Sequence, residues 1–184
     1  MIHYTSPLLG FAAYSGTGKT TLLKQLIPQL RDAGMRVGVI KHAHHQVEFD
    51  RPGKDSYELR KAGAGRVLLA TSRRWALMVD EAEEQEPSLP QLLERLGTSV
   101  LDLVLVEGFR HLAFPKIELH RTSLKKPLIF PEDSSVIAIA SDARIEQETE
   151  LPRLDLNAPL SIADFIREYC ESYPARPSGF TSLP

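Results

Sequence analysis

The chain has a single cysteine, Cys170, among its 184 residues. One cysteine cannot form an internal disulfide framework or supply the thiolates of a structural zinc cage. The chain also lacks an excess of either sign of charge, since its formal net charge is −2. A chain without a basic excess is a poor candidate for electrostatically driven binding to nucleic acid or to a membrane surface.

Targeting and membrane signals are absent as well. The N-terminus, MIHYTSP, has neither a basic region nor an apolar region of the kind found in signal peptides. No apolar run approaches the length that spans a bilayer. We therefore expect a soluble, cytoplasmic protein in a reducing compartment, with no nucleic-acid or membrane partner.

Short apolar runs alternate with segments of helical periodicity, and these patterns predict strands and helices respectively. The expected strands are residues 8–13, 36–41, 66–70, 74–79, 101–106, 116–120 and 136–140; the expected helices are residues 19–33, 55–62, 89–96 and 161–173. This alternation favours an α/β fold whose mostly parallel sheet is covered by helices on both faces. We expect one nucleotide-binding domain over residues 1–173, in which residues 66–79 and 116–120 form an appended β segment, and a frayed tail over residues 174–184.

The segment LLGFAAYSGTGKTTLL, residues 8–23, joins an apolar strand to a helix through a glycine-rich turn. This order is typical of a phosphate-binding loop, in which backbone N–H groups point at the phosphates of a nucleotide, the lysine reaches the β- and γ-phosphates, and the threonine hydroxyl binds Mg²⁺. The pattern asks for glycine where the chain has Ala13, which is small enough for a tight turn. The candidate nucleotide-binding residues are Ser15, Gly16, Thr17, Gly18, Lys19, Thr20 and Thr21.

An acidic partner for this loop follows a later apolar run, LDLVLV, which ends in Glu107 and Gly108. In parallel sheets, ligands collect at the carboxyl ends of the strands. The loops after Ala13, Lys41, Val106 and Ala140 should therefore share one edge. Glu107 is placed there as a Mg²⁺ ligand, directly or through water.

Three histidines, His42, His44 and His45, follow the expected strand 36–41. Their density at a strand end has two interpretations. The loop either offers imidazoles to a transition metal or contacts phosphates and a partner protein. The position of the loop, at the same edge as the nucleotide, favours phosphate or partner contacts.

The segment DRPGKDS, residues 50–56, concentrates charge around a Pro-Gly turn. In one interpretation it is a mobile loop that closes over the γ-phosphate, where Asp50 contacts Mg²⁺ or the attacking water. In the other, Asp55 caps the next helix and the rest of the segment is solvated. A further acid, Asp142, follows the strand 136–140; it either accepts hydrogen bonds from N1 and N2 of guanine or caps a turn. The usual guanine motif, Asn or Thr followed by Lys-x-Asp, is missing.

Four segments taken together resemble the molybdopterin-guanine dinucleotide biosynthesis protein B (MobB) family: AYSGTGKTTLL, VIKHAHHQVEFDRPGKDSYELRKAGA, RWALM and DLVLVEGFR. The resemblance spans about residues 8–142. It implies a phosphate-loop GTPase that binds GTP with Mg²⁺, hydrolyses it weakly and is usually a homodimer. It also implies a role beside the MobA-type guanylyltransferase that joins GMP to molybdopterin. By motif, Gly16, Gly18, Lys19 and Thr20 would hold phosphates, and Thr20 and Glu107 would serve Mg²⁺.

The leading hypothesis is thus a GTP-dependent accessory protein of molybdenum cofactor maturation, with Lys19, Glu107 and Asp50 as the catalytic candidates. Arg51 and Arg110 are the candidates for an arginine finger, and neither is obviously placed as one, so hydrolysis should be slow. The alternative is a nucleotide-gated metallochaperone that uses the loop His42–His45. A small-molecule kinase ranks lower because no arginine-dense lid is visible, and a binding module without hydrolysis stays open.

Overall fold

The computed structural model describes residues 6–43, 50–83 and 85–173. The chain divides into two compact units, one made of residues 1–42 and 89–184 and the other of residues 43–88. The sequence predicts one domain with a small appended β segment. The observed second unit is larger than that segment, since it also contains a helix and the connections on either side.

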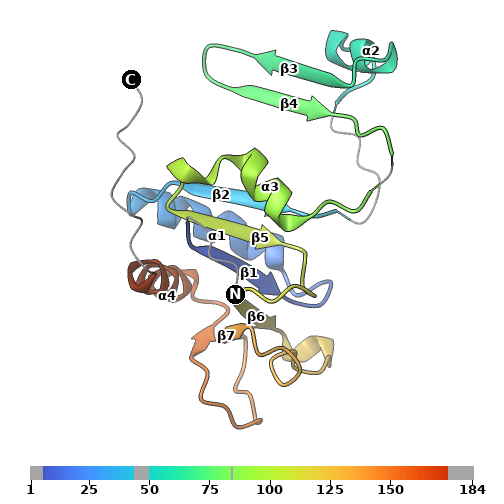
Figure 1. Cartoon of the computed structure of the whole chain (residues 1–184). Coiled ribbons are helices and arrows are strands. Elements are labelled where there is room, and N and C mark those ends of the chain that lie inside the picture. The colour runs from blue at the N-terminus through green and yellow to red at the C-terminus, as the bar shows by residue number, and fades with distance from the viewer. Residues whose placement is uncertain (1–5, 44–49, 84, 174–184) are drawn as a thin grey trace. The chain divides into compact units, whose positions relative to one another are not determined.

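The first unit is built on a six-stranded parallel sheet in the order β2-β5-β1-β6-β7-β8 (Figure 1). Its strands are β1 (Leu8–Ala12), β2 (Val37–Lys41), β5 (Leu103–Glu107), β6 (Lys116–His120), β7 (Val136–Ser141) and β8 (Arg153–Asp155). Because all six strands run in one direction, their carboxyl ends meet at one edge of the sheet. The predicted α/β class and the shared edge are both confirmed.

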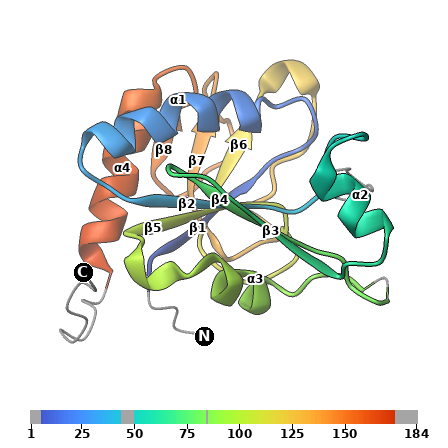
Figure 2. The ribbon, with the colours of Figure 1, turned by 90° about the horizontal axis from the view of Figure 1, so that it is seen from above.

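Successive residues of each central strand face opposite sides of the sheet, and each side is packed by helices. On one side, Leu9, Leu105 and Ile117 form a core with α1 (Lys19–Asp32) and α4 (Pro159–Ser172). These two helices lie side by side, as Figure 2 shows. On the other side, Leu8 and Val104 pack with α3 (Leu89–Leu96). Nearly continuous apolar strands are what a sheet covered on both faces requires. No described helix is both long and apolar enough to cross a membrane.

The expected assignment of residues 116–120 to an appended segment is wrong, because these residues form β6 between β1 and β7 in the main sheet. The alternation of charged and apolar residues in KIELH suggests a half-exposed strand, yet Lys116 and Glu118 are both buried. The Lys116 ammonium group donates to Asp133 at 2.9 Å, and the Glu118 carboxylate accepts two backbone N–H groups, of Ile129 and Phe130, at 2.8 Å. Loop residues thus satisfy charges that would otherwise be costly to bury.

The short strand β8 was not predicted, since three residues are too few to show a period. Helix α4 begins at Pro159, two residues before the predicted start at Ser161. Proline is well suited to the first turn of a helix because its missing N–H has no helical partner there. The predicted tail, residues 174–184, lies outside the described residues.

The second unit contains α2 (Asp55–Lys61) and an antiparallel hairpin of β3 (Arg66–Ala70) and β4 (Trp75–Val79). Arg60 on α2 pairs with Asp80, which directly follows β4, at 3.2 Å. Both faces of the hairpin carry apolar residues, and Leu68, Trp75 and Leu77 are at least half exposed. A two-stranded ribbon is marginally stable alone in water, and exposed apolar surface of this kind is typical of interaction sites.

Candidate nucleotide-binding site

The predicted phosphate loop connects β1 to α1. Gly16 and Gly18 have φ angles of 83° and 98°, and residues with a Cβ atom rarely adopt such positive values. The Thr17 hydroxyl donates to the Tyr14 carbonyl at 2.8 Å, and this bond closes the turn before the helix. Among the described non-glycine residues, a positive φ occurs only at Phe109 and Lys125. Ala13 therefore has a backbone that tolerates its methyl group, which explains how alanine replaces the glycine of the usual pattern.

Lys19 lies back over the loop. Its Nζ atom donates to the Ala13 carbonyl oxygen at 3.2 Å. Burial lowers the pKa of Lys19, and the nearby Glu107 carboxylate acts in the opposite direction. Repulsion from Lys41 and Arg110 adds to the lowering. Several cations thus converge on one loop of a chain with a slightly negative net charge, as an anionic ligand requires.

Glu107 ends β5 at the same edge of the sheet. It lies opposite Phe11 of β1 and Lys41 of β2 in the strand register. Its carboxylate pairs with the Lys41 ammonium group at 3.4 Å, and its side chain is 14% exposed. Asp102 lies at the other end of the strand, where both of its oxygens accept from the Arg36 guanidinium. The two acids of this segment thus lie at opposite ends of β5.

Thr20 and Glu107 offer the oxygen ligands that Mg²⁺ prefers. Mg²⁺ at nucleotide sites is held by one or two protein ligands together with substrate phosphates, so no complete protein cage is needed. Among the residues that the structure describes, no three His, Cys, Asp or Glu side chains are grouped to hold a metal ion. Two oxygen ligands, one from Thr20 and one from Glu107, would suit Mg²⁺ shared with nucleotide phosphates.

The backbone turns sharply after Glu107. Gly108 has a φ of 111°, and a Cβ atom there would lie 2.6 Å from the His42 Cβ atom. The His42 ring stacks on the Phe109 ring with centroids 4.5 Å apart, and the His42 N–H donates to the Glu107 carbonyl at 2.8 Å. His42 is therefore packed against the end of β5. The other two predicted imidazoles, His44 and His45, lie outside the described residues.

Asp50 lies in the second unit and its contacts there are local. One carboxylate oxygen accepts the Arg51 N–H at 2.8 Å. A hydrogen bond from the Ser56 side chain lowers the pKa of Asp50. The expectation that Asp55 caps α2 is wrong, because Asp55 is already the first residue of the helix. The capping position is Lys54, which makes no side-chain cap hydrogen bond.

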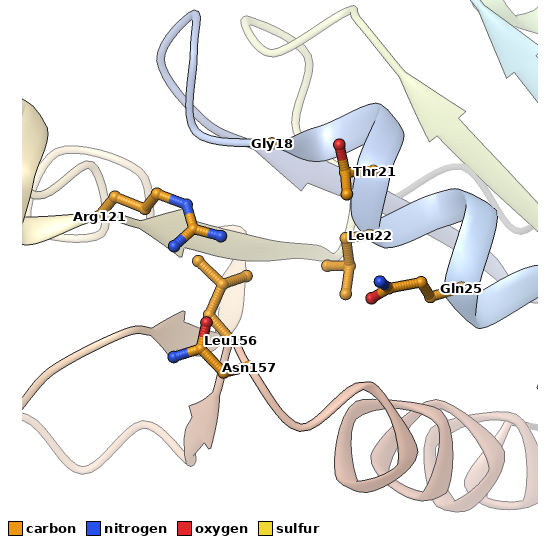
Figure 3. Close-up of a pocket in the computed structure, with 7 residues that line it drawn as sticks. All are labelled: Gly18, Thr21, Leu22, Gln25, Arg121, Leu156 and Asn157. Carbon is orange, nitrogen blue, oxygen red and sulfur yellow. The ribbon is translucent and has the colours of Figure 1, made fainter.

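A cavity of about 170 Å³ adjoins the phosphate loop (Figure 3). Gly18, Thr21, Leu22 and Gln25 line it from the start of α1, and Arg121, Leu156 and Asn157 line it from two later loops. The predicted site includes Gly18 and Thr21 but misses the other five. Ligands collect at the carboxyl ends of parallel strands. Assigning residues 116–120 to the main sheet would therefore have placed Arg121, which follows that strand, among the predicted site residues.

Arg121 connects this cavity to the phosphate loop. Its Nε atom donates to the Thr17 carbonyl at 2.9 Å, and its Nη1 atom lies 3.5 Å from an Asp142 oxygen. The other Asp142 oxygen accepts both the N–H and the hydroxyl of Thr122, each at 3.0 Å. These hydrogen bonds, the Thr122 N–H first, lower the pKa of Asp142, so the carboxylate is ionised at neutral pH.

Comparison with known proteins adds to this geometry. The family model "Molybdopterin guanine dinucleotide synthesis protein B" (MobB) matches residues 8–142. The chain is similar to the Escherichia coli (strain K12) protein named "Molybdopterin-guanine dinucleotide biosynthesis adapter protein", with 51% identity over 90% of this chain and 94% of the relative. A Haemophilus influenzae protein of the same name is 45% identical over 91% of both chains.

Solved structures agree on the fold. A crystal structure of molybdopterin-guanine biosynthesis protein B matches with a TM-score of 0.69 and 26% identity, covering 90% of this chain and 99% of the other. The crystal structure of Bacillus subtilis MobB matches with a TM-score of 0.70 and 22% identity, covering 89% and 97%.

Proposed function

We propose, since this chain belongs to the molybdopterin guanine dinucleotide synthesis protein B (MobB) family, that it binds GTP and hydrolyses it slowly as an accessory protein of molybdenum cofactor biosynthesis. The observation that carries the proposal is the convergence of Lys19, the glycine-rich loop and Glu107 at one edge of the sheet. The names of the relatives, which are adapter proteins of molybdopterin-guanine dinucleotide biosynthesis, supply the pathway.

In this proposal the loop from Ser15 to Thr21 receives the phosphates. Its backbone N–H groups and the N-terminal end of α1 attract the anion. Lys19 exchanges its hydrogen bond to Ala13 for one to a phosphate oxygen and neutralises charge that develops on the γ-phosphoryl group. Water then attacks the phosphorus in line, and the bond to the β-phosphate oxygen breaks.

Thr20 and Glu107 would hold Mg²⁺, which supplies electrostatic stabilisation of the phosphates. The ion pair from Lys41 keeps the Glu107 carboxylate at the edge of the sheet. The proposed contact of Asp50 with Mg²⁺ or with the attacking water comes from the sequence pattern alone. Arg110, close enough to lower the pKa of Lys19, is the cation of this unit that would assist the phosphates, with Arg51 as the second candidate.

We also propose that the chain acts as a homodimer and beside the MobA-type guanylyltransferase. The exposed apolar faces of the β3–β4 hairpin support a partner-bound state. Slow hydrolysis fits an adapter better than a turnover enzyme, because an adapter needs a nucleotide-dependent state rather than product.

The test is a reconstituted guanylyl transfer to molybdopterin with the purified transferase and GTP. Adding this chain should raise the yield or rate of molybdopterin guanine dinucleotide, and Lys19→Ala should remove the increase. An increase of equal size with Lys19→Ala would show that nucleotide binding by this chain is not needed. No change with the wild-type chain would contradict the accessory role.

A further inference from the structure

The cavity lined by Gly18, Thr21 and Arg121 adjoins the phosphate loop. It shares Gly18 and Thr21 with the loop, so a nucleotide whose phosphates lie in the loop would have its nucleoside end within reach of it. At about 170 Å³ it is smaller than the roughly 300–1,000 Å³ of pockets that take a whole drug-sized ligand. Its size therefore suits one part of a nucleotide, such as the base.

The chemistry of the walls matches a planar heterocycle. Leu22 and Leu156 supply apolar surface, and the amide groups of Gln25 and Asn157 supply donors and acceptors. The Arg121 guanidinium points towards the cavity in Figure 3. Sites of this kind, apolar with a few convergent polar groups, are typical of small-ligand pockets.

Two nitrogen atoms of the Arg121 guanidinium are bonded within the protein, and the third can donate to a ligand. Its Nε and Nη1 atoms are bonded to Thr17 and Asp142. Its Nη2 atom makes no hydrogen bond to the residues that the structure describes, and it lies 3.8 Å from the point where a Cβ atom on Gly18 would be. A guanidinium can only donate. It therefore suits guanine, whose O6 and N7 atoms both accept, and disfavours adenine, whose N6 amino group donates.

We propose that this cavity binds the base of the nucleotide, that Arg121 and the Asn157 amide contact the base edge, and that Arg121 selects a 6-oxo purine over adenine. The inference rests on the proposed function, because it presumes that the phosphates lie in the glycine-rich loop. Arg121 would thus select guanine in a chain that lacks the usual guanine motif.

In this arrangement Asp142 positions Arg121 and does not read the base itself. One of its oxygens accepts from Thr122 twice and the other faces Arg121. It is not among the residues that line the cavity. Asp142 is thus a positioning residue that orients Arg121 and the start of the loop after β6.

The experiment measures the affinities of GTP, ITP, XTP, ATP and inorganic tripolyphosphate, each with Mg²⁺, for the full chain and its variants. ITP lacks the 2-amino group but keeps O6 and N7. We expect GTP and ITP to bind within about threefold of each other and ATP to bind about 5- to 100-fold more weakly. Arg121→Lys keeps the charge but loses the planar edge and the Nε bond to Thr17. It should bring GTP and ATP closer together and lower tripolyphosphate affinity much less than GTP affinity. Asn157→Ala should weaken GTP but not tripolyphosphate.

The variants separate the inference from its alternatives. Equal losses of GTP and tripolyphosphate affinity in Arg121→Lys would show that Arg121 only supports the loop, and would overturn the inference. Asp142→Asn should leave the relative affinities of GTP, ITP and XTP unchanged. A shift of preference from GTP to XTP would identify Asp142 as the base reader and also overturn the inference. If the wild-type chain binds neither GTP nor tripolyphosphate, the proposed function itself fails and the inference with it. Arg144→Lys, in the exposed turn after Asp142, is the matched control and should change none of these affinities.

Discussion

The Nζ atom of Lys19 donates a hydrogen bond to the carbonyl oxygen of Ala13, 3.2 Å away across the phosphate loop. The two residues are the beginning and the end of the turn that joins β1 to α1. The bond therefore ties the lysine side chain back to the start of the turn. In the proposed function, a phosphate oxygen takes the place of the Ala13 carbonyl as the acceptor of this bond.

Replacing this lysine tests the phosphate loop. Lys19→Ala should weaken GTP binding by about 10- to 100-fold, because a hydrogen bond from a charged donor to phosphate is lost. Calorimetric titration measures the change. Lys24→Ala, at an exposed position on the same helix, is the matched control and should bind GTP like the wild type. Unchanged affinity in Lys19→Ala would remove the phosphate-loop assignment.

Glu107 is expected to matter for hydrolysis more than for binding. Glu107→Ala should leave GTP affinity nearly unchanged and lower Mg²⁺-dependent phosphate release by about 10- to 100-fold. Single-turnover phosphate release measures this effect even if the basal rate is low. Asp102→Asn changes the acid at the other end of β5, which pairs with Arg36, and should not alter the Mg²⁺ dependence. An equal loss in the two variants would argue that Glu107 acts through stability alone.

The hairpin of the second unit should mediate self-association. The double variant Leu68→Lys with Leu77→Lys places charge on a cross-strand apolar pair and should convert a dimer into a monomer. Light scattering after size exclusion gives the mass. Leu160→Lys introduces a single lysine at an exposed leucine of α4 and should leave the mass unchanged. A wild-type chain that is monomeric at micromolar concentration would contradict the expectation.

Cys170 gives a prediction about pH. Burial, with smaller effects of Asp102 and Glu171, raises the pKa of the Cys170 thiol to about 12. The folded chain therefore favours the neutral thiol, and this contribution to stability is present below the ordinary pKa of about 9 and is lost as the pH rises from 9 towards 12. Denaturant titrations at several pH values should show a smaller loss above pH 9 in Cys170→Ala. Thiol reagents at pH 8 should modify the folded chain far more slowly than the unfolded chain, and equal rates would contradict the raised pKa.

The sequence predicts the phosphate loop and its neighbours well because local signals agree there. An apolar strand, a glycine-rich turn and a helical period follow one another at residues 8–23, and each signal depends on few distant contacts. Glu107 could be placed for a similar reason, since a buried parallel strand has only one end at the ligand edge.

The errors come from residues whose environment depends on distant segments. Lys116 and Glu118 have the alternation of a half-exposed strand, and only Asp133 and the backbone of the following loop make their burial tolerable. Because that strand was misplaced, Arg121 was missed as a site residue. Its guanidinium donates to the Thr17 carbonyl of the phosphate loop, 104 positions away in the sequence. No local pattern in a single sequence encodes such a pairing.

The most direct test of the central claim is calorimetric titration of the purified chain with GTP and with ATP, each with and without Mg²⁺. We predict Mg²⁺-dependent binding of GTP and much weaker binding of ATP. Equal or tighter binding of ATP, or no binding of either nucleotide, would contradict the account.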